Sequence, residues 1–188
     1  MIDHLIREIK SIDAFTDSDI ELAKSLFDEV SVAKGAHFLA EGQVSHHIAY
    51  VKSGLTMHYK IHDGVEVPCD FTPENQWLAY LKSFTTKTPS DMAIMALEDT
   101  TLLRLSYNNL QRLCELQPKF LALKNHYTEL SFFQNTQHGF DLAQLSGKQR
   151  YYKFMKEKPD LLNRVPQYYI AAYLGIKPQS LSRIRKGG

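Results

Sequence analysis

The sequence predicts an α+β fold with three parts: an N-terminal antiparallel β-roll of the jelly-roll type, a long helix, and a C-terminal helix-turn-helix. Between residues 30 and 106, short alternating or apolar segments are separated by glycines and by Asp-Gly and Glu-Asp pairs, which is typical of antiparallel strands. A heptad pattern begins near Leu116. Two short helical patterns around a glycine follow near the end of the chain. The predicted boundaries are 1–115 for the β-roll domain, 116–140 for the long helix and 141–188 for the helix-turn-helix domain.

The N-terminal part begins with two predicted helices. The first covers Ile2 to Lys10, and the second runs from Asp17 or Ser18 to about Phe27, with Asp17 as its cap. Six to eight short strands are expected after it. Among them, Asp63-Gly64 stands between two alternating segments and predicts a tight β-hairpin, because both residues tolerate a positive φ angle.

Composition limits the classes of protein to which the chain can belong. No run of 18 apolar residues exists, so no membrane contact is expected, and the charged N-terminus lacks the pattern of a cleavable signal. The two cysteines, Cys69 and Cys114, fit a reducing compartment and are too few for an iron–sulfur site. We therefore expect a cytoplasmic protein without a cofactor.

The net charge of +1 conceals a strong asymmetry. Residues 144–188 contain ten Lys and Arg side chains and two acidic ones, a net charge of +8. The remaining 143 residues contain 12 basic and 19 acidic side chains, a net charge of −7. A basic module joined to an acidic one is typical of a phosphate-binding domain attached to a separate domain, although an uneven solvated surface would give the same count. Because the excess coincides with the helix-turn-helix, we favour the nucleic-acid interpretation.

The long helix carries a heptad seam, meaning apolar or amide residues spaced alternately by four and three positions. The seam consists of Leu116, Phe120, Leu123, Tyr127, Leu130, Gln134 and Gln137. This spacing is typical of a helix that pairs with a second helix. A helix packed only on its own core would show a wider stripe, an interpretation that Phe133 and Phe140 also favour. Gly139 is the predicted end of the helix.

Two further elements complete the C-terminal domain. A helix from Leu145 or Ser146 to Glu157 is expected to turn Tyr152 and Met155 inward. The helix-turn-helix itself is predicted from Pro166 to Lys186, with Gly175 in the turn and Pro178 at the start of the second helix. The apolar face of that second helix carries Leu181 and Ile184, and its other face carries Gln179, Ser180, Ser182 and Arg183. Such a short polar helix suits a DNA major groove.

The segments YYKFMKEKPDLLN and RVPQYYIAAYLGIKPQSLSRIRK resemble the C-terminal domain of Crp/Fnr (catabolite-activator-type) transcription regulators, most of all the variety from Bacteroidetes-like bacteria. The upstream segments follow the same layout. The resemblance implies a cyclic-nucleotide-binding-like sensor at 1–115, a dimerisation helix at 116–140 and a DNA-binding domain at 141–188. The partners that it implies are double-stranded DNA, a second copy of the chain, RNA polymerase and a small-molecule effector.

Within this resemblance, the second helix of the helix-turn-helix would recognise DNA. Gln179 would bind adenine and Arg183 guanine, with Ser180 and Ser182 adapting to either. The predicted phosphate contacts are Lys177, Arg185 and Lys186, together with Lys148 or Arg150. Relatives continue with strands that form a wing, whereas this sequence ends at Gly187-Gly188. Either the chain lacks a wing or the sequence has been cut, and both would weaken DNA binding.

The effector site departs from the family pattern. Relatives hold a cyclic nucleotide with a Gly-Glu pair and an Arg-Ser/Thr-Ala run, where this chain has Leu78-Ala79-Tyr80 and Ser90-Asp91-Met92. A buried phosphate without a cation is costly, so we expect no ordinary cyclic-nucleotide binding. The residues expected to line the pocket, or simply to pack as core, are Tyr59, Trp77, Tyr80, Leu81, Phe84, Ser90, Met92 and Tyr127.

No catalytic or metal-binding constellation is evident in the sequence, so an enzyme is not expected. Strand alternation places His58, Lys60 and His62 on one face, which we expect to be exposed. The favoured hypothesis is a homodimeric DNA-binding regulator. The alternative is a ligand-binding sensor whose C-terminal domain does not bind DNA and acts through protein contacts. A mobility shift on DNA fragments distinguishes the two hypotheses.

Overall fold

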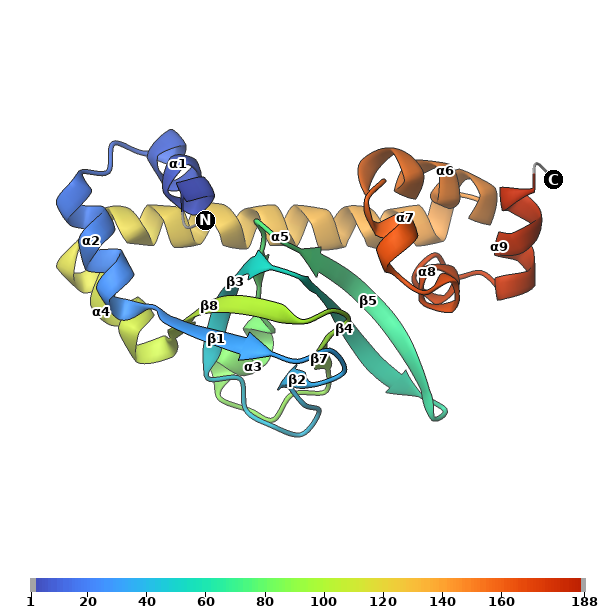
Figure 1. Ribbon diagram of the computed structural model, residues 1–188, viewed down its shortest axis with the longest axis horizontal. Helices are drawn as coiled ribbons and strands as arrows, with labels where there is room; N and C mark the ends of the chain where they lie inside the picture. The colour runs from blue at the N-terminus through green and yellow to red at the C-terminus, as the bar shows by residue number, and fades with distance from the viewer. Residues whose placement is uncertain (1–2, 187–188) are drawn as a thin grey trace.

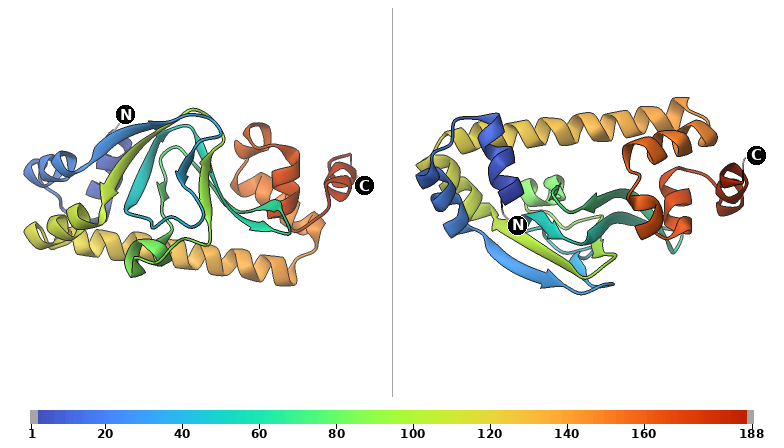
Figure 2. Two further views of the ribbon diagram at one scale, coloured as in Figure 1. Left: turned by 90° about the horizontal axis from the view of Figure 1, so that it is seen from below. Right: turned by 45° about the horizontal axis from the view of Figure 1, so that its top comes forward.

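The computed structural model describes residues 3–186 of the chain. A long helix, α5 (Lys119–Gln144), runs along the length of the molecule. The N-terminal helices lie at one end of α5, a β-roll lies beside its middle, and a helical C-terminal domain lies at the other end (Figures 1 and 2). This arrangement confirms the predicted α+β fold class.

The β-roll consists of two four-stranded antiparallel sheets, ordered β1-β8-β3-β6 and β2-β7-β4-β5. Its elements are β1 (Asp28–Val32), β2 (His37–Leu39), β3 (His47–Ser53), β4 (Leu55–His62), β5 (Val65–Pro73), β6 (Trp77–Leu78), α3 (Leu81–Thr86), β7 (Ala93–Ala96) and β8 (Thr100–Ser106). Both sheets contribute to an apolar interior that includes Ala49, Val51 and Ile94, all fully buried. The predicted hairpin is confirmed, because Asp63 and Gly64 join β4 to β5 with φ angles of 51° and 76°.

The N-terminal helices are α1 (Asp3–Ile12) and α2 (Asp17–Leu26), and Ile2 lies outside the described residues. The prediction that Asp17 caps α2 is wrong. Thr16 is the cap: its hydroxyl accepts from the Asp19 N–H at 3.2 Å, and the Asp19 carboxylate accepts from the Thr16 N–H at 2.9 Å. This reciprocal pair satisfies two backbone donors at once, which a cap at Asp17 would not achieve.

The long helix begins three residues later than predicted and ends later as well. Pro118 and the extended Gln117 separate it from α4 (Tyr107–Leu116), so Leu116 ends α4 and does not belong to α5. Gly139 does not end α5, which continues to Gln144. A helical glycine costs about 1 kcal/mol, and the last turn of α5 is supported by the Arg150 guanidinium, which donates to the Leu142 carbonyl at 3.2 Å.

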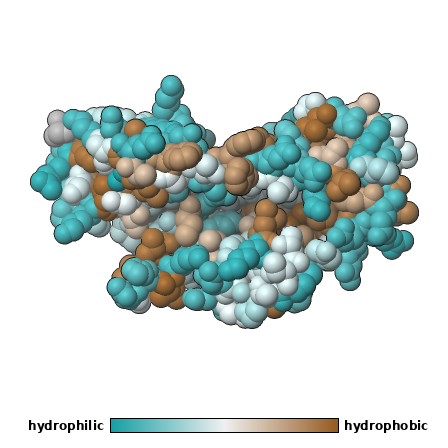
Figure 3. Space-filling view, turned by 180° about the vertical axis from the view of Figure 1, so that it is seen from behind, coloured by the Kyte–Doolittle hydropathy of each residue, from teal (hydrophilic) through white to brown (hydrophobic). Residues whose placement is uncertain are grey.

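The first half of the predicted seam is buried inside the chain itself. Phe120 and Leu123 are 3% and 6% exposed in a core shared with α1, α2 and β3, and Tyr127 packs on Trp77 with ring centroids 5.5 Å apart. The exposed apolar residues of the second half of α5 are Leu130, Phe132, Phe133, Phe140 and Leu142. Figure 3 shows apolar side chains gathered across the middle of the face along which α5 runs.

The C-terminal domain contains α6 (Gly147–Glu157), α7 (Leu161–Arg164), α8 (Gln167–Tyr173) and α9 (Pro178–Arg185). Tyr151 and Phe154 face inward in α6, whereas Tyr152 and Met155, which the sequence analysis assigned to the interior, are exposed. The domain packs against β4 and β5, and the two share one apolar core. Within residues 3–186, no helix has the length and apolar character needed to cross a membrane.

Candidate nucleic-acid interface

Helix α9 lies at the end of the molecule opposite the N-terminal helices (Figure 1). It is preceded by Lys177 in an extended conformation and begins with Pro178, whose fixed φ angle suits a first helical residue. Leu181 is 1% exposed and Ile184 packs against the same core, so these residues hold α9 on the domain. The turn before α9 depends on Gly175, whose φ of 63° favours glycine. The predicted helix-turn-helix is therefore present.

The outward face of α9 brings several predicted DNA contacts together. Gln179, Arg183 and Lys186 are exposed at i, i+4 and i+7 and share this face with the exposed Ser182. Ser180 is half-buried and turned toward the core side. Its predicted contact with a base is therefore less well presented than that of Ser182.

Four cations surround this face without ion-pair partners in the described part of the chain. Lys177, Arg183, Arg185 and Lys186 are all exposed, and none forms an ion pair with another residue between 3 and 186. Their positive charges are concentrated within ten consecutive residues at one end of the molecule. Such a cluster attracts a polyanion and gains free energy by releasing the counterions of nucleic acid.

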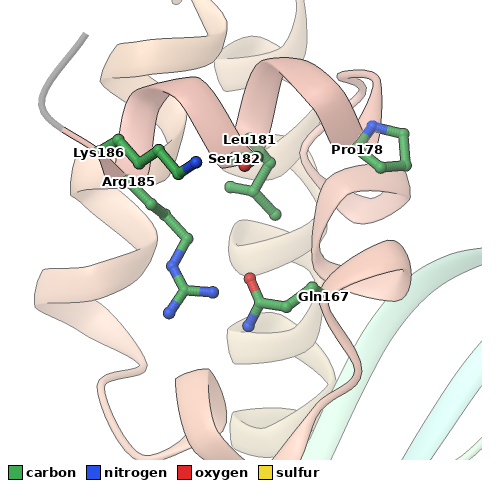
Figure 4. A pocket seen from close by; sticks show the side chains of 6 residues that line it. All are labelled: Gln167, Pro178, Leu181, Ser182, Arg185 and Lys186. Carbon is green, nitrogen blue, oxygen red and sulfur yellow. The ribbon is translucent and has the colours of Figure 1, made fainter.

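A groove of about 480 Å³ runs between α9 and the start of α8. It is lined by Gln167, Pro178, Leu181, Ser182, Arg185 and Lys186. The side chains of Arg185 and Gln167 extend toward the same end of the groove (Figure 4). Gln167 was missed by the sequence analysis. Its position as the first residue of α8, directly after Pro166, could have indicated it, because that turn of a helix-turn-helix lies near the DNA backbone.

Arg150, predicted as a phosphate contact in alternative to Lys148, is engaged within the chain, and its contact with phosphate remains a prediction. The Arg150 guanidinium donates to the carbonyls of Leu174 (2.7 Å), Leu142 (3.2 Å) and Leu145, which lie at the ends of α8 and α5. Unpaired carbonyls at a helix end attract such a donor, so Arg150 fastens two helix ends together. Lys148 is exposed on the first turn of α6, and its role remains a prediction.

Most of the predicted effector-pocket residues are divided among three apolar cores. Tyr59 belongs to the core shared with the C-terminal domain, Trp77, Phe84 and Tyr127 belong to the core beneath the N-terminal helices, and Tyr80 lies against the interior of the roll. Leu81 starts α3, and Ser90 donates to the carbonyl of Met92 in the turn before β7. A second cavity of about 150 Å³ near residues 38–47 is lined by none of them.

Asp91, which replaces the expected cation, is itself held by cations. Lys60 donates to its carboxylate at 2.8 Å, the Tyr80 hydroxyl donates to it as well, and the Lys82 ammonium lies 3.9 Å away. The hydrogen bonds from Lys60 and Tyr80 keep the pKa of Asp91 below its usual range. Burial and the hydrogen bond to Asp91 raise the pKa of Tyr80 to about 12. The nearby cations are thus already engaged by a carboxylate of the chain.

His58 is not on an exposed face as predicted. It is 8% exposed, and its Nε2 lies 3.2 Å from the Thr72 hydroxyl, whereas Lys60 and His62 are exposed. The first half of β4 is covered on both sides, by the interior of the roll and by the C-terminal domain, and only its end extends beyond them. Within residues 3–186, no group of three His, Cys, Asp or Glu side chains is arranged to hold a metal ion.

Comparisons with known proteins agree with this architecture. Residues 29–117 match the family model of the cyclic nucleotide-binding domain. FixK2 from Bradyrhizobium japonicum superposes with a TM-score of 0.76 at 16% identity, covering 86% of this chain and 83% of that one. The c-di-GMP-responsive global regulator CLP from Xanthomonas campestris superposes with a TM-score of 0.71 at 17% identity, covering 92% and 91%. A Crp/Fnr-family transcriptional regulator from Eubacterium rectale gives 0.70 at 16% identity, covering 92% and 83%. No curated protein sequence matches the chain.

The fold class follows from the structure and these matches. Residues 29–117, which match the model of the cyclic nucleotide-binding domain, are followed by a long helix and a helix-turn-helix. As a whole the chain has the fold of the Crp/Fnr-type transcriptional regulators, which confirms the resemblance inferred from the sequence. The assignment to a Bacteroidetes-like branch remains a prediction.

Proposed function

We propose that the chain is a homodimeric, DNA-binding transcriptional regulator of the Crp/Fnr type, and not an enzyme. The observation that carries the proposal is the outward face of α9, where exposed Gln179 and Arg183 lie among four cations that have no partner within the described residues. Side chains of these types suit base edges and phosphates, respectively. The remaining 143 residues carry a net charge of −7, which disfavours a polyanion.

The proposed contacts follow the geometry of α9. Gln179 binds adenine and Arg183 guanine in the major groove, with Ser182 as an adaptable neighbour and Ser180 at the margin. Lys177, Arg185 and Lys186 bind phosphates. We add Gln167 as a phosphate contact, because its amide and Arg185 lie at the same end of the groove beside α9 (Figure 4).

We propose that the dimer forms through the second half of α5. Phe132, Phe133 and Phe140 are 65%, 63% and 54% exposed there, and Phe133 and Phe140 are one heptad apart. Apart from the neighbouring residues and backbone of its own helix, no atom of the described residues lies within 4 Å of where a Cβ on Gly139 would be, so another helix could approach closely. Two copies joined along this face would present two α9 helices to successive major grooves of one DNA duplex.

The effector is proposed to be a small molecule other than an ordinary cyclic nucleotide. Asp91 stands where a phosphate-binding cation was expected, and it engages Lys60 and Tyr80. A cyclic phosphate would have to displace this carboxylate or lie next to its charge. Titration calorimetry with cyclic AMP and cyclic GMP should show no binding at micromolar concentrations. Tight stoichiometric heat would contradict this part of the proposal. Contact with RNA polymerase rests on the family resemblance, and cytoplasmic location rests on composition.

The test is selection of bound sequences from randomised DNA, followed by fluorescence anisotropy on the enriched site. The expected result is an enriched pair of half-sites bound by the wild type, with weaker binding and relaxed preference for Arg183→Ala. Lys34→Ala is the control, because Lys34 is an exposed cation in the β-roll, far along the chain from α9. If no DNA sequence is enriched and Arg183→Ala behaves like the Lys34→Ala control, the result would instead favour a sensor that acts through protein contacts.

A further inference from the structure

The C-terminal domain meets the β-roll at a junction of charged and aromatic side chains, close to strands β4 and β5 (Figure 1). Lys158, the residue after α6, donates to Asp70 of β5 at 2.9 Å, and both side chains are partly buried. The same ammonium lies 5.5 Å from the ring centroid of Tyr173 on α8. Phe71, the neighbour of Asp70, packs on that ring with centroids 5.3 Å apart. The Lys158–Asp70 pair therefore joins the two domains directly.

Two histidines flank this pair. His58 on β4 is the register partner of Asp70 and is almost completely buried. His138 on α5 stacks on Tyr173, with ring centroids 4.3 Å apart and planes inclined by 11°. One imidazole thus lies on the β-roll side of the junction, and the other lies between the long helix and α8.

The charged groups that face the two imidazoles are few: Asp70 and Lys158 for His58, and Asp70, Lys158, Asp141 and Arg150 for His138. Asp141 is already engaged by Lys153, and Arg150 by backbone carbonyls. With neutral imidazoles, Asp70 and Lys158 balance each other. Protonation of either histidine adds a positive charge beside Lys158, and no free carboxylate within this group compensates it.

We propose that this junction is a pH-sensitive latch: protonation of His58 and His138 loosens the C-terminal domain from the β-roll. Burial lowers the pKa of both histidines from the ordinary value of 6.5. Below pH 6.5 the docked state therefore binds fewer protons than the opened state, so docking is fully favourable above that pH and weakens as the pH falls through and below it. Each unit by which a pKa is lowered corresponds to about a tenfold change in the docking equilibrium.

A second anchor does not change with pH over the same range. Arg164 donates to Glu98 and Glu74 and to the Gly54 carbonyl, and a guanidinium keeps its charge at any physiological pH. The pH dependence of docking is therefore expected to come from the histidine junction, with loosening around residues 158–165 and α8 while the β-roll stays folded. This expectation does not depend on whether α9 binds DNA.

Native-state proteolysis of the full chain tests the latch. Thermolysin cleaves before large apolar residues, and Leu161 and Val165 become accessible only when this segment opens, because they are 2% and 3% exposed. Rates at pH 7.5 and 5.5 are divided by those of an unstructured peptide with the same sequence, and the sites of cleavage are identified by mass spectrometry. For the wild type, the corrected rate at these sites should rise about tenfold or more at pH 5.5.

Variants distinguish the effect of protonating His58 and His138 from other effects of acid. The double variant His58→Gln/His138→Phe keeps a hydrogen-bonding group near Thr72 and a ring on Tyr173, and its corrected rate should change less than about twofold. His62→Gln, an exposed histidine at the end of the same strand, should behave like the wild type. A rise that persists in the double variant, cleavage spread through the β-roll, or no rise in the wild type would overturn the latch. NMR titration of the wild type is an independent test. A pKa of 6.5 or above for both His58 and His138 would also overturn the latch.

Discussion

The C-terminal domain carries two sets of cations that differ in what surrounds them. The inward set, Arg150, Lys153, Lys158 and Arg164, is held by backbone carbonyls or carboxylates. The outward set, Lys177, Arg183, Arg185 and Lys186, has no ion-pair partner among residues 3–186. Both sets contribute equally to the net charge of the domain. Part of the basic excess therefore fastens the domain to its neighbours, and part stays exposed on the surface that we propose binds a polyanion.

The largest expected effect comes from breaking the inward set at Arg164. Its guanidinium forms paired hydrogen bonds with both Glu98 and Glu74, and Arg164→Ala would leave these two carboxylates close together without a cation. Arg164→Ala should lower the free energy of unfolding by about 2–4 kcal/mol in denaturant titrations. Lys34→Ala should change it by less than about 0.5 kcal/mol. Equal values for the two variants would show that the inward set does not fasten the domain.

The next largest effect concerns the dimer, which would bring the outward sets of two protomers onto one DNA duplex. Phe133→Lys places a charge on the proposed dimer face and should weaken the dimer by about 2 kcal/mol or more, roughly thirtyfold in dissociation constant, in analytical ultracentrifugation. Leu123→Lys serves as the contrast. Because Leu123 is buried within the chain, this variant should lower the stability of the monomer fold. A wild-type monomer at micromolar concentration would remove the two-half-site arrangement.

Within the outward set, Arg183 is expected to matter most for sequence discrimination. Arg183→Ala should cost about 1–3 kcal/mol at the selected site and relax the preference at one base pair of each half-site. Anisotropy titrations on single-base variants of the site measure both effects. If the preference at every position stays unchanged, α9 is not the recognition helix.

The smallest effect is expected for a phosphate contact. Lys186→Ala should weaken all DNA sequences to a similar extent and reduce the slope of log K against log salt by about one for each protomer. The unfolding free energy should stay within about 0.5 kcal/mol of the wild type, because Lys186 has no ion-pair partner in the described part of the chain. Titrations at four or more salt concentrations measure the slope for the wild type and for Lys186→Ala. Equal slopes would contradict a phosphate contact at Lys186.

Features set by neighbouring residues in the sequence could be predicted. The Asp63-Gly64 hairpin, the turn at Gly175 and the inward face of Leu181 and Ile184 follow from local backbone preference and periodicity, and the structure confirms them. Neighbouring residues that can all cap a helix led to smaller errors. The cap of α2 was predicted at Asp17 and lies at Thr16, which pairs with Asp19 three residues later.

Features set by distant residues could not be predicted. Phe120 and Leu123 have the spacing of a dimer seam, but the N-terminal helices cover them first. Arg150 and Arg164 have the charge of phosphate ligands, yet their partners lie up to 110 residues away in the chain, as in the bond from Arg164 to Gly54. His58 alternates like an exposed residue because the sequence does not reveal that a second domain covers β4.

The salt dependence of DNA binding tests the central claim most directly, because it counts the cations that are free to meet phosphates. If the three outward cations assigned to phosphates, Lys177, Arg185 and Lys186, engage the DNA in each of two protomers, the slope of log K against log salt should be about −5. Replacing all four by alanine should remove most of this slope and lower affinity by at least 100-fold, while the unfolding free energy stays near that of the wild type. A quadruple variant that binds DNA with the wild-type slope and affinity would contradict the assignment of α9 and its cations as the DNA-binding surface.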